Sequence, residues 1–176
     1  MRQMPATIIP DESWSAVHGP IEQLELRPGM SLVLSDFTSS GATTYAHVEQ
    51  SDVAGIGFHL KGGAQFETGE RAFLTQAGDV WAVRARAGEA SRFTLPGSGF
   101  RTAALRLNPE TADELLPLLL PGTASTTVRL PGLNAQSRQA VLQMFAAPYA
   151  GAARHLFLES RALELLASQI AATQNF

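Results

Sequence analysis

A succession of short, β-rich stretches from Ile21 to Leu107 constrains the fold of this 176-residue chain more than any other feature. The stretches are separated by glycine- and proline-bearing turns such as Arg27-Pro28-Gly29-Met30 and Lys61-Gly62-Gly63. Short strands spaced by about 8–12 residues are typical of a β-sandwich or small barrel and not of a parallel α/β sheet. The candidate strands are 22–26, 31–37, 43–49, 54–60, 71–75, 79–86, 90–94 and 100–107.

The pattern changes from strand to helix at Asn108. Asn108 can cap a helix and Pro109 suits its first turn, which predicts a helix that ends near Leu120, before Pro121-Gly122. Two further helices are expected over 134–146 and 155–173, with a bend over 149–153 and a possible extra strand over 128–130. The predicted fold is therefore mainly β, with a C-terminal α-helical segment over 108–176.

The first twenty residues carry three prolines and show no sustained period of 2 or 3.6. We interpret residues 1–20 as an extended arm. Ile8, Ile9 and Trp14 give this arm apolar groups to bury, so it is either a partly ordered tail or a segment that packs on the body of the protein.

Composition excludes several classes of protein. Without cysteine, the chain cannot be a disulfide scaffold, a thiol enzyme or a cysteine-ligated metal protein. A net charge of −3 provides no basic surface for nucleic acid. The longest apolar run, Leu115–Leu120, is too short to cross a membrane, and the N-terminus lacks the apolar core of a signal peptide. We expect a cytoplasmic protein with no membrane partner.

The last predicted helix has more apolar residues than one packed face needs. Leu156, Leu163 and Ile170 lie seven residues apart with Leu166 between them, while Leu158 and Leu165 form a second row. One row can cover the sheet and the other can meet a partner, which predicts a homodimer through Leu156, Leu163, Leu166 and Ile170. The alternative is that these helices simply cover the sheet.

No catalytic constellation is evident in the sequence. There is no Gly-x-Ser-x-Gly motif, and Gly55-Ile56-Gly57 opens no helix, so these glycines indicate a bulge or a close backbone approach instead of a phosphate loop. A ligand cavity inside the barrel is favoured. Its candidate lining residues are Trp81, Phe58, His59, Phe66, Val83, Arg84 and Arg86, with Trp14 of the arm able to close over it. Arg84 or Arg86 could hold a carboxylate.

The order of the elements resembles the N-terminal sensor domain of AraC-family transcription regulators. Within that family, Gly55-Ile56-Gly57-Phe58-His59-Leu60-Lys61-Gly62 and Leu156-Phe157-Leu158-Glu159-Ser160-Arg161-Ala162-Leu163-Glu164-Leu165-Leu166-Ala167 are similar to the pyochelin-responsive, siderophore-sensing branch. The likeness covers most of residues 20–174.

This resemblance implies a cupin-like β-barrel of the double-stranded β-helix type over 21–107 that binds a small effector, and a helical dimerisation segment over 108–176. It also implies a C-terminal pair of DNA-binding helix-turn-helix motifs, which the chain lacks. We therefore expect an excised regulatory domain that meets DNA only through a part not present here. The effector is unidentified, and a siderophore-like or carboxylate compound is a suggestion.

Two other functions remain open on the sequence alone. The first is a cupin-fold isomerase or dioxygenase with a metal held by His47, Glu49 and His59, an incomplete site because no two histidines are two residues apart. The second is a non-catalytic interaction domain with a filled barrel. The leading prediction is a sensor without catalytic residues, metal or cofactor.

Overall fold

The structure is a computed structural model that describes residues 17–68, 71–95 and 97–174. Trp14 therefore lies outside the described residues, as does most of the predicted arm. The strands are β1 (Val17–His18), β2 (Ile21–Arg27), β3 (Met30–Ser39), β4 (Thr43–Val48), β5 (Val53–Lys61), β6 (Ala64–Thr68), β7 (Arg71–Thr75), β8 (Val80–Ala85), β9 (Ala90–Leu95), β10 (Phe100–Leu107) and β11 (Thr126–Leu130). The helices are α1 (Pro109–Leu115), α2 (Ala135–Phe145) and α3 (Gly151–Gln174).

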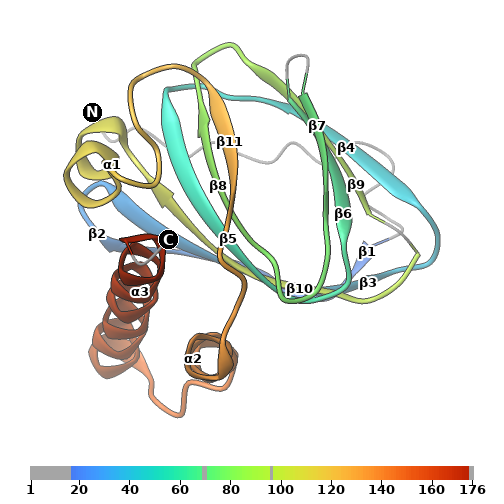
Figure 1. Cartoon of the computed structure of the whole chain (residues 1–176). Coiled ribbons are helices and arrows are strands. Elements are labelled where there is room, and N and C mark those ends of the chain that lie inside the picture. The colour runs from blue at the N-terminus through green and yellow to red at the C-terminus, as the bar shows by residue number, and fades with distance from the viewer. Residues whose placement is uncertain (1–16, 69–70, 96, 175–176) are drawn as a thin grey trace.

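Two antiparallel sheets face each other, as Figure 1 shows. The larger sheet has seven strands in the order β1-β3-β10-β5-β8-β11, with β2 also paired to β3. The smaller sheet has four strands in the order β4-β9-β6-β7. The fold is therefore mainly β and cupin-like, as predicted. The barrel is not closed by hydrogen bonds, because no described strand of one sheet pairs with a strand of the other.

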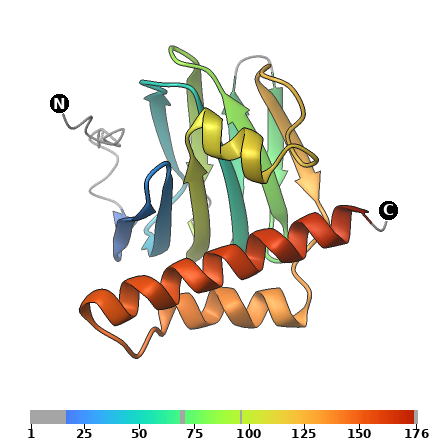
Figure 2. The ribbon, with the colours of Figure 1, turned by 90° about the vertical axis from the view of Figure 1, so that its left-hand side faces the viewer.

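The larger sheet has two different faces because successive side chains on a strand point to opposite sides. One set of residues, including Leu32, Ile56 and Leu105, points toward the helices and is at most 1% exposed. This main core also contains buried residues of all three helices, among them Ala112, Val141 and Leu158. Figure 2 shows the helices lying against this side of the sheet, with α3 running along α2.

Polar contacts join the helices to the sheet. Arg154 of α3 forms a two-pronged ion pair with Glu22 of β2, at 2.8 and 2.7 Å. Arg101 of β10 pairs with Asp36 of β3, and its guanidinium lies 5.3 Å from the centre of the Phe145 ring of α2. The strands of the larger sheet therefore contact α2 and α3 directly.

All three predicted helices are present, with differences at the end of α1 and the start of α3. The Asn108 and Asn134 side chains accept hydrogen bonds from Thr111 N–H and Ser137 N–H, which confirms the predicted cap at Asn108 and adds a second cap at Asn134. α1 ends at Leu115 instead of near Leu120, and α3 already begins at Gly151, inside the predicted bend. Among the described residues, no helix combines the length and the apolar character that crossing a membrane requires.

Two strands change the predicted organisation of the sheets. β6 was missed, and it pairs with both β7 and β9 in the middle of the smaller sheet. β11, predicted only as a possible strand over 128–130, returns to the edge of the larger sheet and pairs with β8. The sequence after Leu107 therefore supplies a strand of the barrel as well as helices.

A second, smaller core lies between the sheets at one end. It consists of Phe37, Tyr45, Ala64, Leu95 and Phe100, each no more than 7% exposed. These side chains fill the space between β3 and β10 on one side and β4, β6 and β9 on the other. The remaining space between the sheets is not filled in this way.

Candidate ligand-binding cavity

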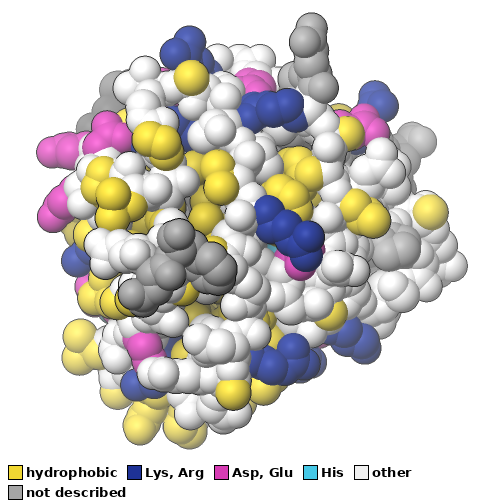
Figure 3. Space-filling view, viewed as in Figure 1, with side chains coloured by type: hydrophobic (Ala, Val, Ile, Leu, Met, Phe, Trp, Pro, Cys, Tyr) yellow, Lys and Arg dark blue, Asp and Glu magenta, His cyan; other side chains and the backbone are white. Residues whose placement is uncertain are grey.

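A cavity of about 330 Å³ lies between the two sheets. Side chains of both sheets line it, among them Trp81 of β8, Phe93 of β9 and Thr102 of β10. In the space-filling view, hydrophobic side chains are visible between the positions of β11 and β7, flanked by Lys or Arg side chains (Figure 3). The cavity is of the size and apolar character usual for small-molecule sites.

One wall of the cavity is a row of aromatic rings across the smaller sheet. The residues are direct cross-strand partners: Tyr45 with Phe93, Phe93 with Phe66, and Phe66 with Phe73. The Phe66 ring centre lies 4.5 Å from that of Phe93 and 5.1 Å from that of Phe73, and the Phe66 and Phe73 rings are stacked. The row gives the cavity a continuous aromatic surface.

Trp81 extends this aromatic surface onto the larger sheet. Its ring stacks on Phe73 with a centre-to-centre distance of 4.6 Å. The indole N–H donates to Asp79 Oδ2 at 3.4 Å, and Arg129 donates to Asp79 Oδ1 at 2.6 Å. Burial alone would raise the pKa of Asp79, but hydrogen bonds from Arg129, the Gln76 N–H and Trp81 outweigh it and lower the pKa. Asp79 thus stays ionised and orients the tryptophan ring.

Part of the opposite wall, on the larger sheet, is built from small residues next to Trp81. Gly57 of β5 pairs with Ala104 of β10 on one side and Trp81 of β8 on the other. A Cβ added to Gly57 would lie 3.4 Å from His59 Nε2. Gly55, two residues earlier on the same face, also lines the cavity. The absence of side chains at these two positions leaves space in front of the aromatic row.

His59 is the buried titratable group of the cavity. It is 3% exposed, and its Nδ1 lies 3.5 Å from the Thr102 hydroxyl. Burial lowers the pKa of His59 to about 4, although the charge of Asp79 acts to raise it. The imidazole is therefore neutral near pH 7. Its Nε2 has no hydrogen-bond partner among the described residues and can bond to a ligand.

A charged pair lies farther along the larger-sheet wall of the cavity. Arg106 of β10 donates from Nη2 to Glu49 Oε2 at 2.9 Å. The Glu49 side chain is 7% exposed and that of Arg106 is 34% exposed. Both residues line the cavity. The cavity therefore has His59 and Thr102 toward one end and an arginine–carboxylate pair toward the other.

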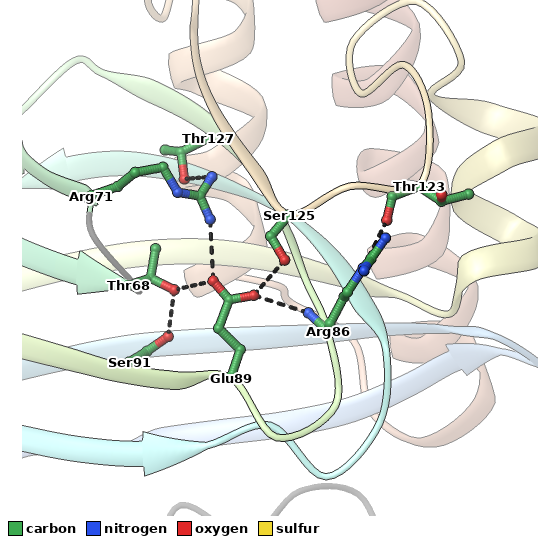
Figure 4. Close-up of polar contacts among 8 residues, drawn as sticks. All are labelled: Thr68, Arg71, Arg86, Glu89, Ser91, Thr123, Ser125 and Thr127. Atoms are coloured by element: carbon green, nitrogen blue, oxygen red, sulfur yellow. Dashed lines mark hydrogen bonds and ion pairs between the residues drawn. The ribbon is translucent and has the colours of Figure 1, made fainter.

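A polar network centred on Glu89 bridges the free edges of the two sheets (Figure 4). Glu89 accepts hydrogen bonds from Thr68, from Arg71 of β7 and from Ser125, which immediately precedes β11, at 2.9, 3.1 and 2.5 Å. It also accepts from the Arg86 N–H. Burial would raise the pKa of Glu89, but the hydrogen bonds from Ser125, Arg86 and Thr68, with the charge of Arg71, lower it. The network joins β7 to the segment that begins β11.

Four of the residues proposed from the sequence to line the cavity do so: Trp81, His59, Phe66 and Val83. Three others do not. Phe58 is fully buried in the main core, on the helix side of β5, and does not line the cavity. Trp14 is outside the described residues.

Arg84 is also on the opposite face. It is 5% exposed and donates to Asp113 of α1 at 2.8 Å and to the Leu120 carbonyl at 3.2 Å. Arg84 therefore ties α1 and the following turn to β8, which corrects its proposed place on the cavity wall. Arg86, the other arginine considered, is exposed and donates to the Thr123 carbonyl.

The residues predicted for a dimer interface are not equally accessible within one chain. Leu156 is 66% exposed, whereas Leu166 is 3% exposed and belongs to the main core. Leu163 and Ile170 are partly buried against that core. The row that covers the sheet is thus Leu158, Leu165 and Leu166, and Leu166 is not available to a partner.

No group of three or more His, Asp or Glu side chains is placed to hold a metal among the described residues. Of the three candidate ligands, the His47 side chain is not described. Glu49 is paired with Arg106, and His59 lies beside Thr102.

Several lining residues were missed from the sequence. Phe73, Phe93 and Thr102 lie on strands that were largely predicted, but their meeting depends on which strands pair and in what register. Arg106 had no distinguishing local signal. The one usable signal was Gly55-x-Gly57, whose spacing places two residues without side chains on a single face of β5.

The sequence matches the model of a family described as the regulatory protein PchR N-terminal domain, over residues 18–175. Among solved structures, it is similar to the AraC-like transcriptional activator CuxR, with a TM-score of 0.54 and 15% identity over 92% of this chain. The chain spans 65% of that structure's length. This likeness shows the fold.

Two further solved structures have lower scores. KdgF from Halomonas sp. matches with a TM-score of 0.42 and 12% identity, over 55% of this chain and 84% of that one. A cupin 2 conserved barrel domain protein from Salinispora arenicola matches with a TM-score of 0.40 and 16% identity, over 53% and 79%. Among proteins with curated descriptions, none matches the sequence.

Proposed function

The chain belongs to the family of PchR N-terminal regulatory domains, and from this premise we propose that it senses a small effector molecule that binds between its two sheets. The observation that carries this proposal is the cavity itself. An aromatic row faces a wall that includes Gly55, Gly57 and Ala104, and the buried His59 presents an Nε2 that has no hydrogen-bond partner among the described residues. Such apolar cavities with few polar groups are suited to specific binding.

The regulatory output is proposed to pass through a longer protein. The similar AraC-like activator is longer than this chain, and a net charge of −3 provides little affinity for DNA. We assign the DNA contact to a part of the protein outside this sequence. Contacts of Arg101 with Phe145, and of Arg154 with Glu22, provide a route from the larger sheet to the helices.

The outer face of α3 is the proposed homodimer surface. Its exposed residues include Leu156, Ser160, Ala167 and Ala171, none of which carries a charge. Small and apolar residues on one helix face allow a second helix to approach closely. We therefore keep Leu156 in the proposed interface and place Leu163 and Ile170 at its border.

Membership of a regulatory family also supports a non-enzymatic role. The metal-enzyme alternative would need Glu49 and His59 in one ligand set. Glu49 instead forms an ion pair with Arg106, and His59 lies beside Gly57 and Thr102. We propose that the cavity binds its ligand without chemical change.

The proposed binding site is tested by filling the cavity. Gly57→Leu places a side chain into the cavity, whereas Gly41→Leu adds the same side chain where nothing lies within 4 Å. A library of small molecules is screened by thermal shift against both variants and the unsubstituted chain. Compounds that stabilise the unsubstituted chain and Gly41→Leu, but not Gly57→Leu, support the proposal. Compounds that stabilise all three equally contradict it.

A further inference from the structure

We propose that the effector is a flat, largely apolar acid, an aromatic or conjugated carboxylate whose acid group binds Arg106. This inference rests on the proposed function, because it takes the cavity between the sheets as the effector site. It adds the chemical class of the ligand and the residue that selects it.

The shape of the cavity favours a flat molecule. The stacked Phe66 and Phe73 rings, continued by Trp81, present aromatic surface on one side. Gly55, Gly57 and Ala104, on the facing wall, carry no side chain or only a methyl group and leave space in front of these rings. A conjugated ring system inserted there stacks on the aromatic row and brings its other face against backbone.

The charge of the ligand follows from Arg106. Among the described residues that line the cavity, Arg106 is the single Lys or Arg. One of its five N–H donors is used by Glu49, and the guanidinium makes no other hydrogen bond within the described part of the chain. The remaining donors can form the paired hydrogen bonds that arginine makes with carboxylates.

A cationic ligand is disfavoured by the same contacts. The two carboxylates on the lining, Glu49 and Glu67, each have a cationic neighbour, Arg106 at 2.9 Å and Arg92 at 3.7 Å. Neither carboxylate therefore offers an uncompensated negative charge. The neutral His59 adds no charge at the other end.

The positions of the polar groups also indicate how long the ligand can be. Arg106 and Thr102 lie on the same face of β10, four residues apart, which corresponds to about 13 Å along a strand. An acid group at Arg106 thus leaves room for a fused ring system before the ligand reaches His59 and Thr102.

Three probes of nearly the same shape test the inference by isothermal titration calorimetry. They are 2-naphthoate, the neutral 2-naphthamide and the cationic 2-naphthylmethylammonium. We expect 2-naphthoate to bind about tenfold more tightly than 2-naphthamide, since charge-assisted hydrogen bonds contribute more than neutral ones. The cation is expected to bind weakest. Glu49→Gln removes the carboxylate that competes for Arg106 and should strengthen naphthoate binding.

Removing the arginine provides the decisive comparison. Arg106→Met alone leaves Glu49 buried without its cation, so the double variant Arg106→Met/Glu49→Gln is measured beside it. Both should lose the preference for naphthoate while binding naphthamide as before. Arg92→Met is the matched control, because Arg92 is exposed and does not line the cavity.

The two proposals fail in different ways. Equal affinity for naphthoate and naphthamide, a preference that survives in Arg106→Met/Glu49→Gln, or no binding of naphthoate overturns the proposed ligand class. If the probes bind but Gly57→Leu leaves their affinity unchanged, they bind elsewhere, and the proposed cavity site is overturned as well.

Discussion

At the scale of single residues, His59 shows how burial determines the state of a side chain. The imidazole is enclosed by the Phe66 and Phe100 rings, whose centres lie 6.4 and 5.9 Å from its own. Those rings offer no hydrogen bonds that would stabilise the charged form. Burial therefore keeps His59 neutral, and a ligand meets an uncharged donor or acceptor at that end of the cavity.

The lowered pKa of His59 should make the protein sensitive to mild acid. In the unfolded chain His59 protonates near pH 6.5, whereas in the folded chain its pKa is about 4. The contribution of neutral His59 to stability is thus fully present above about pH 6.5 and is lost as the pH falls toward 4. The free energy of unfolding should decrease by about 2 kcal/mol between pH 7 and 4.5. Urea unfolding at both pH values should show this loss. In His59→Gln the loss of unfolding free energy between pH 7 and 4.5 should be smaller by about the same 2 kcal/mol. An unchanged pH dependence in that variant would show that His59 is not the group responsible.

The Glu89 network should be worth more than an ordinary surface ion pair. The Glu89 side chain is 15% exposed and accepts from Thr68, Arg71, Ser125 and the Arg86 N–H. Glu89→Gln replaces one acceptor with a donor, so we expect a loss of about 1–3 kcal/mol in the free energy of unfolding.

Glu67→Gln is the matched control for this change. Glu67 is 39% exposed and lies 3.7 Å from an exposed arginine, so its substitution should cost no more than about 0.5 kcal/mol. Chemical denaturation of both variants gives the comparison. Equal losses would show that the network does not hold the sheet edges together.

Neighbouring residues explain how far the site could be predicted from the sequence. Trp81 and His59, which line the cavity, were singled out because aromatic and polar residues stand out in an alternating strand. Phe58 and Arg84 are next to cavity-lining positions in the sequence but point to the helix side. Alternation separates the two faces of a strand but does not say which face meets the other sheet and which meets the helices.

At the scale of elements, α3 has one row that packs on the sheet and another that is exposed. Leu156→Glu changes a residue that is 66% exposed, and should alter the stability of the fold by no more than about 0.5 kcal/mol. Leu166→Glu places a charge in the main core, where Leu166 is 3% exposed, and should cost about 4 kcal/mol or more.

The same substitutions test the proposed dimer. We expect light scattering to find a dimer for the unsubstituted chain and a folded monomer for Leu156→Glu. Leu118→Glu, at a residue that is 56% exposed and outside α3, should leave the dimer intact. A dimer that persists in Leu156→Glu would place the interface elsewhere.

Local signals predicted the elements where they were strong. Asn108-Pro109 and Asn134 mark the helix starts, and the glycine-bearing turns mark most strand ends. β6 was missed because its five residues, Ala-Gln-Phe-Glu-Thr, carry a single large apolar side chain. β11 is a strand because its backbone completes the edge of the larger sheet beside β8, a long-range contact that no local pattern contains.

At the scale of the whole molecule, we expect that the larger sheet does not fold stably without the segment after Leu107. Its helix side exposes Leu32, Ile56 and Leu105 if the chain is cut after Leu107, and β8 loses its partner β11. A fragment ending at Leu107 should therefore aggregate or unfold without cooperativity, because apolar patches of this extent are not stable in water. Near-ultraviolet circular dichroism and urea unfolding test this. A soluble fragment with a cooperative transition would show that 21–107 is an independent domain.

The two walls of the cavity differ in what lies behind them. The main core and three helices lie behind the larger sheet. A substitution in this sheet therefore affects packing both in the cavity and in the main core. The reverse face of the smaller sheet carries exposed residues such as Thr44, Gln65 and Leu74. A substitution in the aromatic wall therefore disturbs packing on the cavity side only. Among related regulators, the shape of the cavity should diverge more through β4, β6, β7 and β9 than through β5, β8 and β10.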